Sequence, residues 1–330
     1  MLFQSGFKFF KSYCQSGLKI LLTLFSLNFF HSSDAQQTPL NPLSYWVFTP
    51  YIYNPAMVGS KDYLTIDLNA AFQEKSYAQI LGCNTRLSRT QPGYFSSPQL
   101  KEFNGVGLGG SLFNDYNGTS HNIGLNAAGS YQFSMGSEDL SFLSFGASVK
   151  GVYNISDSSF TETGSPSKNT FYPNLDGGIY YYGTNLFTGV SVINVLGNPG
   201  ERDSLGHYRI EAGRQYYFSI GYKFLISKVQ NIVLEPSILV NVTDSTFGKI
   251  EDNINPILKL YIDNICIGSY FFSDGNTSFF FQYRYPKFYL GAFYELPRKT
   301  AYYKKAPIVE LTFGFNFRSD KSRFSKRSQW

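Results

Sequence analysis

Hydrophobic and polar positions alternate with a period of two along most of this chain. In residues 64–70 the even positions are apolar, while Thr65, Asp67 and Asn69 lie between them, and residues 123–133 and 309–317 alternate in the same way. Successive side chains of a β-strand point to opposite faces, so each run predicts a strand with one apolar and one polar face. In a soluble sandwich the apolar face is turned inward, whereas in a membrane barrel it faces lipid and the lumen is polar.

The number and length of these runs favour the barrel. Fourteen strand-like runs are separated by turn residues, and no segment shows convincing helical periodicity. Most runs approach the roughly 9–11 residues that a tilted strand needs to cross a bilayer, whereas strands of soluble sandwiches are commonly about 5–6 residues long. The runs are 64–72, 79–87, 105–113, 121–133, 140–153, 173–182, 186–195, 215–224, 229–241, 256–262, 265–272, 278–285, 288–294 and 307–317.

The connections between the runs also alternate. Those after the fourth, sixth, eighth, tenth and twelfth runs are short, and those after the fifth, seventh, ninth and thirteenth are long. Outer-membrane barrels have short periplasmic turns and longer extracellular loops, which produces this alternation. The connection 88–104 is long where a short turn is expected, and 73–78, 114–120 and 273–277 are short where loops are expected.

Composition agrees with a membrane barrel. Aromatic residues make up 18% of the chain and charged residues 15%, and aromatic clusters such as residues 180–182 and 279–281 fall at or near run ends, where interfacial girdles lie. We therefore predict an all-β fold, a transmembrane antiparallel outer-membrane β-barrel of about 14 strands over residues 64–317. The alternative is a secreted soluble sandwich, which would partition into water without detergent.

The N-terminus predicts export. Lys8, Lys11 and Lys19 precede or flank a short apolar stretch, residues 20–30, and a small-residue site ends at Ala35. This order is typical of a cleaved signal peptide over residues 1–35. We expect residues 36–63 to form a periplasmic N-terminal segment and residues 318–330 a basic tail. The expected location is the cell outer membrane.

The charge and the reactive side chains argue against several function classes. Residues 1–35 carry +2 and the tail +4 of the formal +5, so the body between them carries −1, which is not the basic face of a nucleic-acid-binding protein. Only His121 and His207 remain in the predicted mature chain, without a nucleophile motif or a metal-ligand cluster. We predict no enzyme activity, no cofactor and no metal. The sequence leaves open whether Cys83 and Cys266 pair.

A motif before the first run carries a family resemblance. Residues 51–60 read Tyr-Ile-Tyr-Asn-Pro-Ala-Met-Val-Gly-Ser, after Gln36-Gln37 at the predicted mature start. This stretch resembles the opening signature of the PorP/SprF family of the type IX secretion system, and weaker glycine and tyrosine matches follow along the chain. Val309 stands where the family usually has a histidine, which leaves the partner contacts near the C-terminus open.

The resemblance implies an outer-membrane component of type IX secretion in Bacteroidetes-type bacteria, which supports the secretion or surface anchoring of gliding or adhesin cargo. The implied partners are outer-membrane lipid, periplasmic lipoprotein or ring components, and secreted cargo with a type B C-terminal domain. The alternative function is an outer-membrane transport channel for small or hydrophobic solutes, because a fold alone does not fix a function.

The motif is also the candidate partner-binding site. Its aromatic residues are too apolar for a free tail, so we expect them to pack into the barrel mouth or against a partner. The Asn-Pro pair restricts the backbone, and Gly59 can take a positive φ, so the segment is suited to a fixed turn. The candidate residues are Tyr51, Tyr53, Asn54, Pro55, Ala56, Met57 and Gly59.

Overall fold

The computed structural model describes residues 43–61, 63–74, 76–88, 105–116, 120–135, 141–156, 169–202, 208–211, 213–244, 246–296 and 307–317. The expected signal peptide 1–35, the start of the N-terminal segment and the basic tail 318–330 lie outside the described residues. In the described residues, no helix has the length and apolarity needed to cross a membrane.

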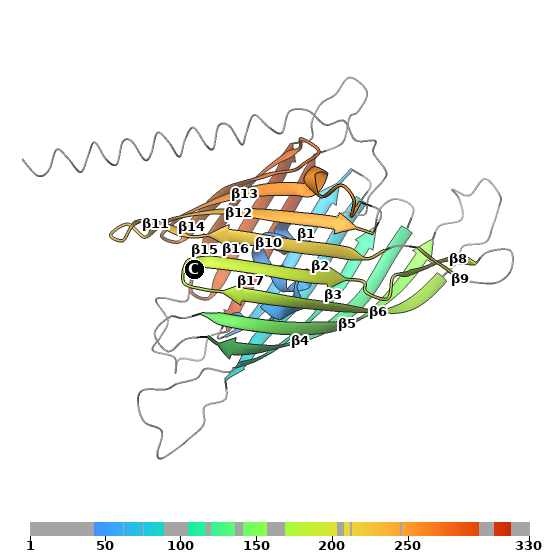
Figure 1. Cartoon of the computed structure of the whole chain (residues 1–330). Coiled ribbons are helices and arrows are strands. Elements are labelled where there is room, and N and C mark those ends of the chain that lie inside the picture. The colour runs from blue at the N-terminus through green and yellow to red at the C-terminus, as the bar shows by residue number, and fades with distance from the viewer. Residues whose placement is uncertain are drawn as a thin grey trace, which may run out of the picture.

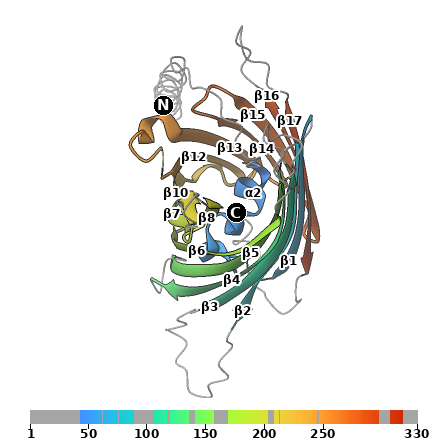
Figure 2. The same cartoon turned by 90° about the vertical axis from the view of Figure 1, so that its right-hand side faces the viewer.

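Fourteen antiparallel strands close into a barrel (Figures 1 and 2). β1 (Leu64–Gln73) pairs with β17 (Ile308–Phe317), which closes the ring. β10 (Gln215–Tyr222) and β11 (Phe224–Ser227) act as one strand interrupted at Lys223, because both pair with β12 (Ile232–Thr243). The other barrel strands are β2 (Ser76–Ser88), β3 (Gly105–Tyr116), β4 (Ser120–Ser134), β5 (Phe142–Ser156), β6 (Asn169–Tyr182), β7 (Leu186–Ile193), β13 (Ile254–Ile262), β14 (Ile265–Phe271), β15 (Thr277–Arg284) and β16 (Phe288–Leu296).

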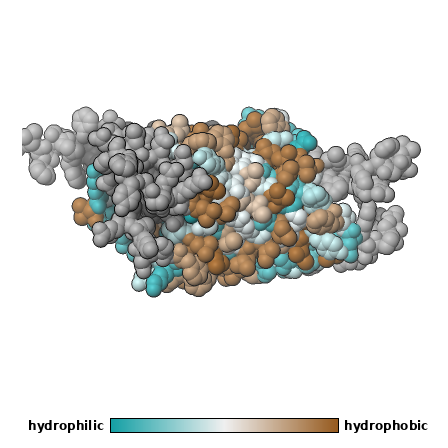
Figure 3. Space-filling view, turned by 90° about the horizontal axis from the view of Figure 1, so that it is seen from below, coloured by the Kyte–Doolittle hydropathy of each residue, from teal (hydrophilic) through white to brown (hydrophobic). Residues whose placement is uncertain are grey.

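The outside of the wall is apolar, and the inside carries the buried polar side chains together with one apolar cluster, which confirms the membrane barrel over the soluble sandwich. In β1, Asp67 and Asn69 are fully buried, while Leu68 between them is 50% exposed. The same alternation leaves Leu125 and Val149 at 58% exposure, and apolar side chains spread over the outside of the strands (Figure 3). A soluble sandwich would bury these apolar side chains.

The strand connections divide the barrel into two ends. The turn end holds the tight connections 183–185, 263–264 and 285–287, together with the start of β1 and the end of β17. The loop end holds the longer connections, and one of them carries an unpredicted hairpin of β8 (Asn198–Arg202) and β9 (Tyr208–Glu211), which extends beyond the wall at the right of Figure 1. The four exceptions to the alternation of lengths are also observed.

A short helical segment, which periodicity did not predict, lies inside the barrel. It consists of α2 (Leu43–Phe48) and the 3-10 helices η2 (Pro50–Ile52) and η3 (Pro55–Met57). Looking along the barrel, the strands surround these helices (Figure 2). Each helix is at most six residues long, so no apolar period could develop in the sequence.

The two cysteines of the described barrel are both free. Cys83 in β2 is exposed on the outer face, whereas Cys266 in β14 is buried and faces the lumen. Because the wall separates the two thiols, they do not pair.

Substituting Val149 by arginine is expected to destabilise the barrel by about 2–4 kcal/mol, because an arginine on the lipid face near the bilayer midplane must leave water. Val149 lies halfway along β5 and points outward. Urea unfolding of the barrel refolded in lipid vesicles measures the effect, and Val149→Leu, which keeps the side chain apolar, is the control. Equal stability of the two variants would contradict the outward orientation.

Candidate functional site

Residues 44–60 form a plug inside the lumen, and local sequence explains its bends. Pro50 and Pro55 stand in the first turn of the 3-10 helices, where a missing N–H costs nothing. The Asn54 side chain caps η3 by accepting a hydrogen bond of 3.0 Å from the Ala56 N–H. Gly59 has a φ of +69°, which a residue with a side chain rarely adopts. We call these residues the plug.

Polar side chains of the wall bind the backbone of the plug. Ser144 donates to the Ala56 carbonyl over 2.6 Å, and Ser191 donates to the Tyr53 carbonyl over 2.6 Å. Ser130 and Gln132 both donate to the Val58 carbonyl, and the Gly59 N–H donates to Asn84. Buried backbone groups need such partners because water is excluded. The polar face predicted for the lumen therefore supplies hydrogen-bond partners to the backbone of another part of the same chain.

Glycines in the wall let the plug approach closely. A Cβ atom added at Gly146 would lie 2.3 Å from the Ala56 nitrogen, and one at Gly107 would lie 2.2 Å from the Val58 carbonyl oxygen. Gly107 is therefore a position where only a hydrogen leaves room for the plug. The wall glycines that contact the plug in this way are Gly82, Gly107, Gly146, Gly178 and Gly291.

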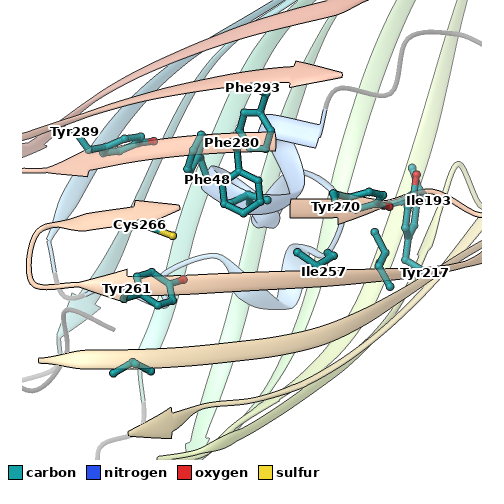
Figure 4. Packing of buried hydrophobic residues seen from close by; sticks show 13 residues of the cluster. Phe48, Ile193, Tyr217, Ile257, Tyr261, Cys266, Tyr270, Phe280, Tyr289 and Phe293 are labelled. Atoms are coloured by element: carbon teal, nitrogen blue, oxygen red, sulfur yellow. The ribbon is translucent and has the colours of Figure 1, made fainter. Parts of the chain in front are cut away.

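The opposite side of the plug is aromatic. Trp46 stacks on Tyr217 of β10 with ring centroids 6.1 Å apart, and Phe48 meets Phe293 of β16 edge-on at 5.0 Å. Phe48 lies among the labelled rings of the wall in Figure 4, and both Phe48 and Phe293 are buried. Aromatic pairs at these distances add stabilisation beyond the area that they bury. Apolar packing thus complements the hydrogen bonds on the other side.

Carboxylates of the wall bind the plug at two further points. Asp67 of β1 accepts hydrogen bonds from the hydroxyls of Tyr51 in the plug and of Tyr289 in β16. Glu310 of β17 accepts a bond of 2.7 Å from the Ser44 N–H. Burial raises the pKa of Tyr51 well above the usual value of a phenol, and the Asp67 charge raises it further. Tyr51 is therefore a neutral donor.

The structure brings all the predicted motif residues together in the lumen. Tyr51, Asn54, Pro55, Ala56 and Gly59 are buried, whereas Tyr53 and Met57 are half-buried. We expect these residues to pack into the barrel mouth or against a partner, and in the structure they lie inside the barrel. Their role in binding a partner stays a prediction.

Sequence reasoning missed the wall side of the site. Ser130, Ser144, Ser191 and Gly146 are ordinary lumen-facing residues by pattern, and Trp46 precedes the motif. The sequence signal that indicates these wall contacts is the repeated placement of glycine at inward positions of long strands. Within the described residues, no group of three or more His, Cys, Asp or Glu side chains is arranged to hold a metal ion.

A family model described as "Type IX secretion system membrane protein PorP/SprF" matches residues 34–315. No curated protein matches the chain at a significant level.

Solved structures similar to the chain include three bacterial membrane proteins. BamA from Haemophilus ducreyi lacking POTRA domains 1–3 is 13% identical, with 78% of this chain and 71% of that chain covered and a TM-score of 0.36. The translocator domain of the autotransporter NalP from Neisseria meningitidis is 10% identical, with coverages of 79% and 90% and a TM-score of 0.37. The β domain of the Bordetella autotransporter BrkA is 11% identical, with coverages of 77% and 97% and a TM-score of 0.35.

Proposed function

This chain belongs to the PorP/SprF family of type IX secretion system membrane proteins, and from that premise we propose that it is a closed scaffold in the outer membrane. In this proposal it supports the secretion or surface anchoring of cargo proteins by binding other proteins, not by conducting them through its lumen. The family and the barrel fold suggest a structural component of the secretion system rather than an enzyme.

The plug is the observation that carries the proposal. Backbone atoms of residues 53–59 are bound by side chains of four wall strands, β2, β4, β5 and β7. The wall glycines are shaped to this backbone, and the aromatic side of the plug packs against β10 and β16. A transport channel needs an open path through the lumen, and the bound plug lies inside that lumen, so the plug supports the scaffold over the channel.

The proposed partners follow from the family. They are periplasmic lipoprotein or ring components at the turn end, which by barrel convention faces the periplasm, and secreted cargo with a type B C-terminal domain. The motif residues contribute by holding the plug, and Met57 is the half-buried residue among them that borders a cavity.

Locking the plug to the wall with a disulfide tests the proposal. A Cβ atom at Gly178 would lie 3.0 Å from the Asn54 Cγ, the atom whose position a cysteine sulfur would take at residue 54. This is about the distance between the Cβ atom of one cysteine and the sulfur of the other in a disulfide. We expect Asn54→Cys with Gly178→Cys to form a bridge in a background of Cys83→Ala and Cys266→Ala. Cells that lack the wild-type protein but carry this locked barrel should display cargo on their surface at the normal level.

The control is each single cysteine variant in the same background. If the single variants restore cargo display and the locked barrel does not, the plug must open and the scaffold proposal fails. Bridge formation is measured by gel mobility with and without a reducing agent, so an unlocked plug is recognised before cargo is scored.

A further inference from the structure

A small cavity lies between the plug and the wall. Its volume is about 100 Å³, and Trp46, Val47, Pro50 and Met57 line it from the plug side. Residues of β6, β7, β10, β12 and β13 complete the lining, together with Lys223 between β10 and β11. The charged residues of the lining are Lys223, Glu235 and Lys259. One water molecule takes about 30 Å³ of liquid volume, so the cavity has room for about three waters or one short side chain.

Two of the three charged groups in the cavity wall neutralise each other. The Lys259 ammonium lies 2.9 Å from a Glu235 carboxylate oxygen, and these side chains are only 12% and 4% exposed. A buried charge is costly unless it is paired, so this ion pair belongs to the wall itself. It does not require a ligand.

The cavity lining keeps one positive charge in excess, because Glu235 is its one carboxylate and interacts electrostatically with both Lys259 and Lys223. The Lys223 ammonium lies 3.2 Å from the Tyr182 hydroxyl and 4.9 Å from the centroid of the Tyr182 ring. Among the described residues, no carboxylate lies within ion-pair distance of Lys223. One carboxylate balances only one of the two ammonium charges, so the half-buried Lys223 ammonium, which contacts the Tyr182 phenol, favours an anion.

The cavity lies at the turn end. Lys223 stands at the interruption between β10 and β11, and its backbone N–H donates over 2.8 Å to the carbonyl of Asn185, in the tight turn between β6 and β7. Three further cations, Lys61, Arg86 and Arg284, lie over aromatic rings in the same half of the lumen. Two buried carboxylates, Asp67 and Glu235, also lie in this half of the lumen, but the cations outnumber them. The excess positive charge attracts an acidic chain that approaches this end.

We propose that this cavity binds an acidic side chain of a partner protein that docks at the turn end. The carboxylate pairs with the Lys223 ammonium, and the aliphatic stem lies against Met57 and Trp46. The volume suits a glutamate or aspartate side chain and is too small for a nucleotide or a lipid headgroup. The inference rests on the proposed function, in which the barrel acts by binding partners, and it adds the chemistry by which one of them is recognised.

Blocked peptides test the cavity on the full-length barrel purified in neutral detergent. The probe is acetyl-Gly-Leu-Glu-Leu-Gly-amide carrying an uncharged dye, and its matched control has glutamine in place of glutamate. Fluorescence anisotropy should give at least tenfold tighter binding for the glutamate peptide. Equal binding of the two peptides overturns the proposal. A third peptide has the glutamine sequence and a free C-terminal carboxylate in place of the amide. If this peptide binds more tightly than the blocked glutamate peptide, the cavity recognises a chain end, and the assignment to a side chain is overturned.

Variants connect this preference to the cavity. Lys223→Met should abolish it, whereas Lys228→Met, which removes the same charge from the exposed neighbouring turn, should keep it. Met57→Glu places a carboxylate beside Lys223 and should also abolish the preference, while Met57→Gln should keep it. Heat-modifiable migration on gels reports that each variant is folded.

A preference that survives Lys223→Met in a folded barrel overturns the proposal. This outcome is separate from failure of the proposed function, because the locked barrel is scored by cargo display in cells and contains an intact cavity. Normal cargo display by the locked barrel, together with equal peptide binding, would reject the cavity alone.

Discussion

Replacing Gly146 by valine is expected to displace the plug and turn a non-conducting barrel into a conducting one. A Cβ atom at this position would lie 2.3 Å from the Ala56 nitrogen and 2.3 Å from the Pro55 carbonyl carbon. Both are backbone atoms, and β5 itself is held by hydrogen-bonded ladders to β4 and β6, so the plug must give way. Planar-bilayer recordings should show stepwise openings for the variant and none for the parent.

Gly177→Val is the matched control for this experiment. Gly177 lies on the neighbouring strand β6, and no atom lies within 4 Å of the position that its Cβ would take. We expect this variant to remain silent in the bilayer. A folded Gly146→Val barrel that also stays silent would contradict the view that close contact with wall glycines keeps the plug in place.

Replacing Lys259 by methionine is expected to destabilise the barrel by about 3–5 kcal/mol, because it leaves a buried carboxylate without its partner. Glu235 is 3% exposed, and the Lys259 ammonium lies 2.9 Å from it. Urea unfolding in lipid vesicles measures the loss. The double variant Lys259→Met with Glu235→Leu should recover most of it, since neither member of the ion pair is then buried without the other.

Lys228→Met controls for the loss of one positive charge from the same end of the barrel. Lys228 is exposed, so its removal should change the free energy of unfolding by less than about 0.5 kcal/mol. If the double variant is as unstable as Lys259→Met alone, the loss arises from packing of the lysine stem and not from the unpaired carboxylate.

The order and approximate bounds of the barrel strands follow from the sequence alone. Alternation with a period of two has only two readings, and long runs with aromatic ends favour the one in which the apolar face meets lipid. The predicted run 64–72 is β1 (Leu64–Gln73), and the run 307–317 is β17 (Ile308–Phe317). The interruption at Lys223 was not predicted, because one residue of irregular backbone leaves the alternation of its neighbours unchanged.

The motif of residues 51–60 was also recognisable in the sequence, together with the turn that Asn54, Pro55 and Gly59 make. Its location required the tertiary structure. A polar inward face predicts that the serines and amides of the wall need partners, but water and a second part of the chain satisfy such groups equally well. Only the fold brings Ser144, which is 88 residues away in the chain, and Gly146 to the backbone of Ala56. The alternation along each strand thus determined the wall, whereas contacts between distant parts of the chain decided what fills it.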